Sequence, residues 1–366
     1  MATRLDGIKR DLGRLGVTFA LAVVTGVIFL KLGAPAPFLM GSLFGVWMVG
    51  ASLPKLQPHL GVARWFHIPV VLGLGVLIGS TFTTSALAHA LNWWPTVVAM
   101  ILVTIAVTAL GYIVLTRGRG YDPMLAFFCA IPGGQAEAIV LARDHVEKDY
   151  VVALFHLIRV AFVFLSTPLL LGFVEGTAAV ADSNAKLANM PSLLDLPQRE
   201  LGLFIAMAIG GYLLARVCRL PLPHLFGPVA VSTIAHAAGV VALPRIYEFV
   251  MLAQLSIGGA VGARLAQVQF RELVVYLRDA TINTVMILSL YFIAALAIAA
   301  MTDRGILQMW LAFVPGGLYE VTLLTLIFGF DIAYVAVHHT IRIMLIFISM
   351  PVMARSFSHR SRSTTE

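Results

Sequence analysis

The chain has 366 residues, of which 60% are hydrophobic and 12% are charged, and its formal net charge is +7 at pH 7. A soluble globular domain carries about 25% charged residues, so this composition excludes an ordinary soluble protein and indicates a membrane protein. The positive charge requires no nucleic-acid partner, because basic residues gather at the cytoplasmic ends of membrane segments.

Apolar stretches recur along the whole chain, with lengths near the roughly 20 residues that a helix needs to cross a bilayer. We therefore predict an all-α protein, a polytopic bundle of transmembrane helices. In the first half the predicted segments are 15–33, 36–53, 68–87, 93–115, 122–143 and 150–173. In the second half they are 201–218, 222–242, 246–266, 280–301, 306–328 and 332–353.

Basic residues flank both ends of the membrane region. They are Arg4, Lys9, Arg10 and Arg14 at the start, and Arg355, Arg360 and Arg362 in a basic tail at 355–366. The positive-inside rule therefore predicts that both termini lie in the cytoplasm.

The sequence IPGGQAE at residues 131–137 is unusual within an apolar segment. Pro132 lacks an amide donor, and Gly133 and Gly134 weaken a helix, so the stretch should break or start one. Such a break must lie inside protein or beside a water-filled cavity. A helix that starts at Gly134 would present free amide groups suited to an anion. Glu137, in its first turn, could instead bind a proton or a cation.

The following segment carries two ionisable residues on one helix face, His156 and Arg159. Ionisable residues inside membrane segments cost free energy, because they are removed from water, and they often mark a functional site. A structural role remains open, in which Arg159 forms an ion pair with Glu137 that fixes helix packing. For His156 the alternatives are handling of a proton or substrate and polar packing.

A polar stretch at 174–200, rich in Asp, Ser, Asn and Pro, divides the chain. We interpret it as a polar linker between a first membrane repeat at 1–173 and a second at 201–354.

The second half repeats the first motif, with VPGGLYE at 314–320. The matching residues are Pro315, Gly316, Gly317, Glu320, His339 and Arg342, with His338 beside them. The separation from Pro to His is 24 residues in both halves, and from Pro to Arg it is 27 in both. This coincidence indicates an internal duplication. Gln135 and Tyr319 differ between the halves and are therefore candidates for selecting a cargo.

Duplicated repeats around a site built from interrupted helices are typical of transporters. If the PGG segment of each half is re-entrant, each repeat crosses five times and most basic loop residues fall on the cytoplasmic side. We therefore predict inverted repeats, each with a broken or re-entrant PGG helix. Small residues at GxxxG spacing, in 41–45 and 258–262, predict close helix packing.

The paired stretches IPGGQAEAIVLARDHVEKDYVVALFHLIR and VPGGLYEVTLLTLIFGFDIAYVAVHHTIR are where the chain resembles the AbrB family of bacterial inner-membrane proteins. The resemblance covers nearly the whole chain and implies a location in the bacterial inner membrane. The family carries two labels, a regulator of gene expression and an ammonia monooxygenase. Its broken-helix pattern is also similar to that of cation/proton antiporters and anion transporters, which implies two inverted five-helix repeats.

From these patterns we predict an ion- or proton-coupled secondary transporter of a small, anionic metabolite, and not an enzyme. Its partners would be the bilayer and the substrate, without nucleic acid or cofactor, and a homo-oligomer is left open. A membrane regulatory or sensor protein is the alternative, with any effect on gene expression indirect. A membrane oxygenase has the least support, because the histidines are scattered and only His156, His339 and His338 could meet at a metal.

Overall fold

The computed structural model describes residues 2–133, 135–220, 222–268 and 273–363, and their side chains except at 2–6, 135–137, 140 and 351–363. Every regular element in this part of the chain is a helix, which confirms the predicted all-α class. Seven of the described helices are long and apolar enough to cross a membrane, namely Gly7–Lys31, Thr84–Gly118, Asp149–Ala188, Gln198–Val217, Tyr247–Ala266, Val274–Ala300 and Ile332–Met350. Shorter apolar helices are Pro37–Ser52, Arg64–Gly79 and Leu318–Phe328. The chain is therefore a multi-pass membrane protein.

The chain forms two compact units. The first comprises Met1–Leu91, Leu165–Val268 and Tyr319–Ala333, and the second comprises Asn92–Phe164, Gln269–Leu318 and Tyr334–Glu366. Each unit draws segments from both halves of the sequence. The predicted repeats are therefore not two separate compact bodies, and their boundaries and inverted orientation stay predictions.

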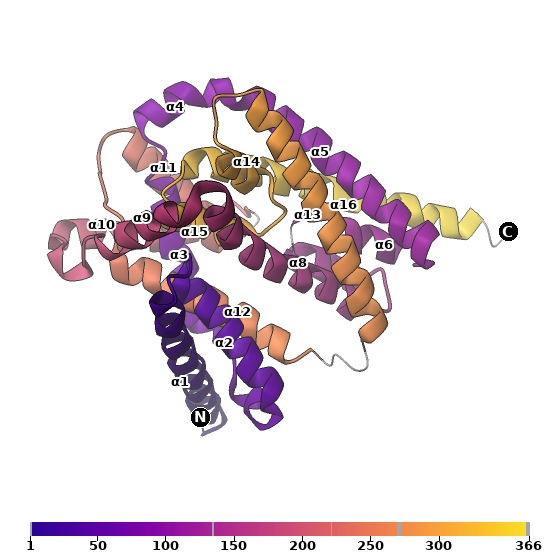
Figure 1. Cartoon of the computed structure of the whole chain (residues 1–366), viewed down its shortest axis with the longest axis horizontal. Coiled ribbons are helices and arrows are strands. Elements are labelled where there is room, and N and C mark those ends of the chain that lie inside the picture. Colours follow the sequence, from indigo (N-terminus) through magenta and orange to yellow (C-terminus); the bar gives the residue numbers. More distant parts are fainter. Residues whose placement is uncertain (1, 134, 221, 269–272, 364–366) are drawn as a thin grey trace. The chain divides into compact units, whose positions relative to one another are not determined.

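The first unit is built mainly from two helix triplets. They are α1 (Ala2–Lys31), α2 (Pro37–Ser52) and α3 (Arg64–Gly79), and α10 (Gln198–Val217), α11 (Pro223–Ala237) and α12 (Tyr247–Ala266). Helix α2 packs against α1 and α12, and α11 packs in the same way against α10 and α3. Figure 1 shows α1 and α2 side by side in indigo and purple. Exchanging α1, α2 and α3 for α10, α11 and α12 leaves this set of contacts unchanged.

Glycines let these helices approach closely. A Cβ atom added to Gly41 on α2 would lie 2.5 Å from the Cα of Gly26 on α1, and one added to Gly211 on α10 would lie 2.7 Å from the backbone of Gly227 on α11. A Cβ atom on Gly262 of α12 would lie 2.5 Å from the carbonyl oxygen of Leu43. The packing role predicted for the GxxxG stretches is thereby confirmed.

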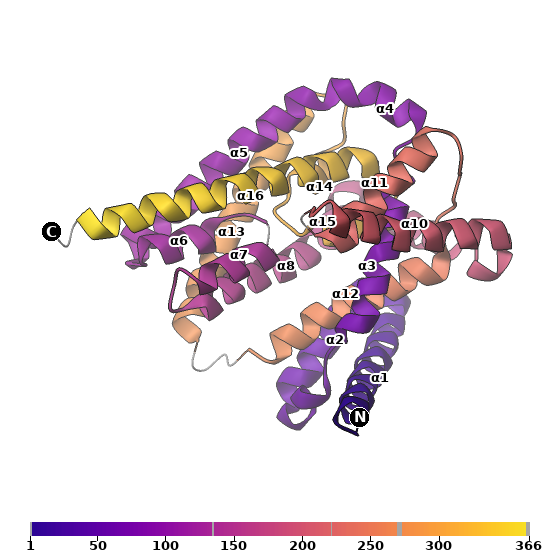
Figure 2. The same ribbon diagram turned by 180° about the vertical axis from the view of Figure 1, so that it is seen from behind.

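The second unit holds the whole of the first PGG motif and the second motif as far as Leu318. Its helices are α5 (Trp94–Ile113), the π-helical turn η3 (Val114–Gly118), α6 (Pro123–Ala130), α7 (Gln135–Arg143), α13 (Val274–Ala300), α14 (Ile306–Phe313), α16 (Ile332–Ser363) and most of α8 (Asp149–Leu170). Helix α5 packs against α6 and α13, and α13 packs against α14. Figure 2 shows α16 as the long yellow helix, and its residue His338 hydrogen-bonds Thr96 near the start of α5.

Each predicted membrane segment coincides with a helix or with a pair of short helices. The stretch at 174–200, however, is not a simple loop, because it contains α9 (Gly176–Ala188) and the short 3₁₀ turn η5 (Leu193–Asp195). Alanine is the strongest helix former, and Asp182 pairs with Lys186 one turn later at 2.7 Å, which offsets the polar composition. The remaining elements are α4 (Thr84–Ala90), α15 (Leu318–Phe328) and the short turns η1 (Pro54–His59), η2 (Leu91–Trp93) and η4 (Leu171–Glu175). The predicted basic tail is likewise helical, since α16 continues to Ser363.

Candidate functional site

The first PGG motif separates two short helices, as predicted. Helix α6 ends at Ala130 and α7 begins at Gln135, and between them Gly133 has a φ of 124°, a conformation that side-chain-bearing residues rarely adopt. Pro132 cannot donate a hydrogen bond, so the last carbonyl groups of α6 have no partner within their own helix. In a membrane each such carbonyl needs a donor from elsewhere.

Helix α8 supplies those donors. The guanidinium group of Arg159 donates through Nη1 to the carbonyl oxygen of Ile131, and through Nη2 to that of Cys129 at 2.7 Å. One turn earlier, Nε2 of His156 lies 3.1 Å from the carbonyl oxygen of Phe128. Both side chains are buried. The positive charge of Arg159 also interacts favourably with the negative end of the α6 dipole.

The second PGG motif is held in the same way from α16. Helix α14 ends at Phe313 and α15 begins at Leu318. Arg342 donates through Nη1 to the carbonyl oxygen of Phe313 at 2.9 Å, and Nε2 of His339 lies 2.9 Å from that of Leu311. The pairs His156–Phe128 and His339–Leu311 are both 28 residues apart in the sequence. The same contact thus recurs at equivalent positions of the two halves.

The two breaks meet inside the second unit. A Cβ atom on Gly133 of the first motif would lie 3.7 Å from Nε of Arg342 and 3.3 Å from Ile346, both on α16 of the second half. Arg159 and Arg342 are close enough for their charges to repel, and both act on the hydroxyl of the buried Tyr291. Two buried guanidinium groups therefore lie near each other in the second unit.

His338 lies beside this region in a different environment. Its Nε2 is 3.0 Å from Oγ1 of Thr96, its Nδ1 is 2.8 Å from the carbonyl oxygen of Tyr334, and its ring stacks obliquely on that of Tyr334 at 4.3 Å. The ring nitrogens of His338 therefore contact protein atoms, and so does Nε2 of both His156 and His339. This arrangement favours polar packing over a shared metal.

The remaining predicted site residues fall elsewhere. Gly134 lies outside the described residues, as do the side chains of Gln135 and Glu137, so the pairing of Glu137 with Arg159 stays a prediction. In the second half, Pro315, Gly316 and Gly317 belong to the second unit, with Tyr319 and Glu320 in the first. Glu320 is 5% exposed in the first turn of α15.

Tyr319 has a neighbour that sequence reasoning did not identify. Its ring meets that of His67 on α3 edge to face, with centroids 6.1 Å apart, and Nδ1 of His67 lies 3.0 Å from Oγ of Ser256 on α12. No local pattern marks His67, because its partners come from distant segments.

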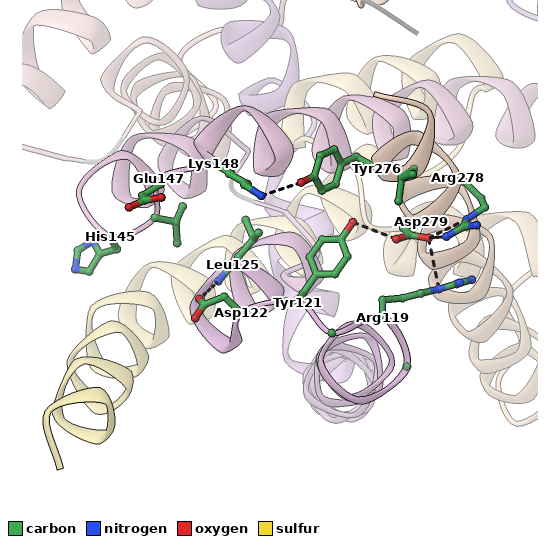
Figure 3. Close-up of a pocket in the computed structure, with 14 residues that line it drawn as sticks. Arg119, Tyr121, Asp122, Leu125, His145, Glu147, Lys148, Tyr276, Arg278 and Asp279 are labelled. Carbon is green, nitrogen blue, oxygen red and sulfur yellow. Dashed lines mark hydrogen bonds and ion pairs between the residues drawn. The ribbon is translucent and has the colours of Figure 1, made fainter. Parts of the chain in front are cut away.

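A cleft in the second unit was also missed. It has a volume of about 950 Å³ and is lined by residues from the loop between η3 and α6, the loop between α7 and α8, and the start of α13. Figure 3 shows Arg119, Arg278 and Tyr121 converging on Asp279, and Lys148 directed at Tyr276. The hydrogen bond that Lys148 donates to the Tyr276 hydroxyl raises the pKa of the lysine. Burial, followed by the charge of Asp279, raises the pKa of Tyr121 above its usual range.

The cleft and the first break lie at opposite ends of α6. Asp122 of the cleft caps the start of this helix by accepting from the amide nitrogens of Met124 and Leu125, and the carbonyl groups bound by Arg159 lie at its end. A helix of eight residues is about 12 Å long. Tyr121 of the cleft also packs edge to face on Phe155, which directly precedes His156. The two features are thus joined through α6 and α8.

One protein family and two bacterial proteins match this chain over most of its length. The family described as "Transition state regulatory protein AbrB" matches residues 47–358. The "Uncharacterized protein YhjN" of Bacillus subtilis (strain 168) is 23% identical over 358 residues, covering 90% of this chain and 92% of that protein. The "Putative regulator AbrB" of Escherichia coli (strain K12) is 24% identical over 351 residues, covering 94% and 96%. Because the family match spans most of the sequence, the chain is a member of the AbrB family of helical membrane proteins.

Proposed function

We propose that this protein is a secondary transporter of a small organic anion, with its binding site at the two PGG breaks. The observation that carries the proposal is the pair of buried guanidinium groups, Arg159 and Arg342, that hold the ends of two interrupted helices. A helix interrupted within a membrane is tolerated where the chain lines a cavity or a binding site.

The charge distribution favours an anion. The two arginines direct their amino groups at backbone carbonyls, so they act as charge balance for the ends of α6 and α14. The beginnings of α7 and α15 each place the positive end of a helix dipole at a break. When Glu137 and Glu320 are protonated, these groups make the potential at the breaks positive, which disfavours a cationic cargo.

Coupling to protons is the role we propose for the glutamates. Glu137 and Glu320 each follow their proline by five residues and lie in the first turns of α7 and α15. A carboxylate beside an anion site repels the cargo when ionised and admits it when protonated, which links anion movement to proton movement. We further propose that the protein resides in the bacterial inner membrane with both termini in the cytoplasm.

The test is uptake into proteoliposomes of purified protein under an imposed pH or sodium gradient, with a panel of small organic anions, amino acids and ammonium. We expect gradient-driven flux of an organic anion that is abolished by Glu137→Gln and by Glu320→Gln. Glu175→Gln, at an exposed position in η4, serves as the matched control and should transport normally. Unchanged flux in both test variants would remove the glutamates from the mechanism.

A membrane regulatory protein is the second candidate, because the matched family and the Escherichia coli relative are both described as regulators. A regulatory role predicts saturable ligand binding to the purified protein without flux of any compound. Deleting the gene should then change transcription, and a binding-deficient variant should fail to restore it. Flux in proteoliposomes would decide for the transporter.

A further inference from the structure

The cleft beside α6 contains an ion network that the proposed transport cycle does not use. Three segments far apart in the sequence form its walls, and they contribute Arg119 and Tyr121, Lys148, and Tyr276, Arg278 and Asp279. Its volume of about 950 Å³ is large enough for a small organic molecule. The chemistry of these side chains indicates the class of ligand.

Asp279 is the centre of the network. Its carboxylate is 3% exposed, and its Oδ2 accepts from the hydroxyl of Tyr121 at 3.3 Å. Its Oδ1 accepts from Nε and Nη2 of Arg278 at 3.2 and 3.1 Å, and Nε of Arg119 lies 3.4 Å from the same oxygen. One buried carboxylate thus holds two guanidinium groups side by side (Figure 3).

Both arginines retain donors that Asp279 does not occupy. Nη1 and Nη2 of Arg119 and Nη1 of Arg278 have no hydrogen-bond partner among the described residues. The two side chains are 32% and 55% exposed, so these groups can reach a ligand. Fixed guanidinium forks match the planar oxygens of a carboxylate or a phosphate, which is why arginine is favoured at sites for those groups.

The charged side chains around Asp279 favour the binding of an anion. Two arginines face one carboxylate at Asp279, which leaves one positive charge uncompensated, and Lys148 adds another. Of the other two carboxylates that line the cleft, Asp122 is engaged in capping α6, and Glu147 is exposed in the loop before α8. Over the whole lining three basic and three acidic side chains cancel, so the excess of positive charge is confined to the part of the cleft where two arginines face Asp279.

Aromatic rings line the wall next to this charge. Tyr276 accepts a hydrogen bond from Lys148 at 3.0 Å and meets Tyr121 edge to face at 6.1 Å. Tyrosine rings offer apolar area for a carbon skeleton together with a hydroxyl for hydrogen bonding. We propose that this cleft is a binding site for a small organic anion whose carboxylate or phosphate group contacts Arg119 and Arg278. The proposal does not depend on transport.

Binding of two probes to the full-length protein tests this site. Inorganic phosphate and succinate are titrated by calorimetry into the protein held in nanodiscs of phosphatidylcholine. A second arm uses nanodiscs that also contain phosphatidylglycerol, and mass spectrometry measures how much of that lipid stays bound, because a lipid headgroup carries the same phosphate chemistry. We expect saturable binding in one arm. Arg278→Gln should lower the affinity about tenfold, because the variant loses a charge-assisted hydrogen bond to the anion.

Matched variants test whether the anion binds at this cleft. Arg216→Gln removes one charge from α10 in the first unit and should leave binding unchanged, whereas Lys148→Gln should weaken it. Retention of phosphatidylglycerol that depends on Arg278 would identify a lipid as the source of the anion, and saturation by phosphate or succinate would identify a soluble one. Absence of binding in both arms, or equal effects of Arg278→Gln and Arg216→Gln, would overturn the proposal. A transport failure with intact binding at this cleft would count against the proposed function alone.

Discussion

Arg342 fixes the tautomer of His339. Nη2 of Arg342 lies 2.8 Å from Nδ1 of His339, and Nε2 of His339 lies 2.9 Å from the carbonyl oxygen of Leu311. Because a guanidinium group can only donate, Nδ1 must accept, and the ring proton is on Nε2, where it is donated to the carbonyl. The imidazole of His339 therefore links Arg342 to the carbonyl oxygen of Leu311 in α14 through two hydrogen bonds.

This relationship predicts a spectroscopic signature. In solid-state NMR of protein labelled with ¹⁵N-histidine, His339 should show the Nε2-protonated neutral form, identified by its loss in His339→Gln. Arg342→Gln should redistribute the tautomers, because Nδ1 then loses its donor. An Nδ1-protonated ring in the wild type would contradict this hydrogen-bond geometry.

Arg159→Gln should destabilise the protein. The substitution removes the donors that satisfy the carbonyl oxygens of Ile131 and Cys129, and each buried acceptor left without a donor costs about 1–3 kcal/mol. We expect a loss of about 3 kcal/mol in the free energy of unfolding, visible as a lower melting temperature in scanning fluorimetry. Arg159→Lys keeps the charge but not the fork, so its loss should be smaller. Arg216→Gln, in the last turn of the membrane-spanning helix α10, is the control and should change stability little.

Adjacent glycines on α10 offer a matched test of helix packing in the first unit. Gly211→Ala places a Cβ atom 2.7 Å from the backbone of Gly227, so α10 and α11 must separate, at a cost of about 1–3 kcal/mol. Gly210→Ala meets nothing within 4 Å and should stabilise the helix by about 0.5 kcal/mol. Melting temperatures that move in opposite directions would support this packing. Equal shifts in the two variants would contradict it.

Tyr121 gives a pH dependence with a defined sign. Burial and the charge of Asp279 raise the pKa of its hydroxyl in the folded protein above the usual value of about 10. The unfolded chain then loses this proton first, so the contribution to stability is complete below pH about 10 and declines as the pH rises further. Melting temperatures between pH about 9 and about 11 should fall less steeply in Tyr121→Phe than in the wild type. Tyr212→Phe, on α10, is the comparison variant, and an unchanged slope in Tyr121→Phe would show that folding does not raise the pKa of Tyr121.

The amino-acid sequence by itself determined where the helices lie and where they break. Hydropathy located the membrane segments, since each spanning helix must be apolar over a length set by the bilayer. The interruptions at Pro132 and Pro315 were predictable because a missing amide donor and two glycines act within a single turn. The shared helix face of His156 and Arg159 followed from their spacing alone. These features depend on interactions between neighbours in the chain.

Only the tertiary structure decided what the ionisable residues contact. Arg159 and Arg342 both donate to backbone carbonyls at the ends of short helices, and any backbone carbonyl looks alike in a sequence. The cleft around Asp279 could not be predicted at all, since Tyr121 and Asp279 are 158 residues apart. Such contacts arise when folding brings distant helices together, because burying a charge requires a partner but does not specify which segment provides it.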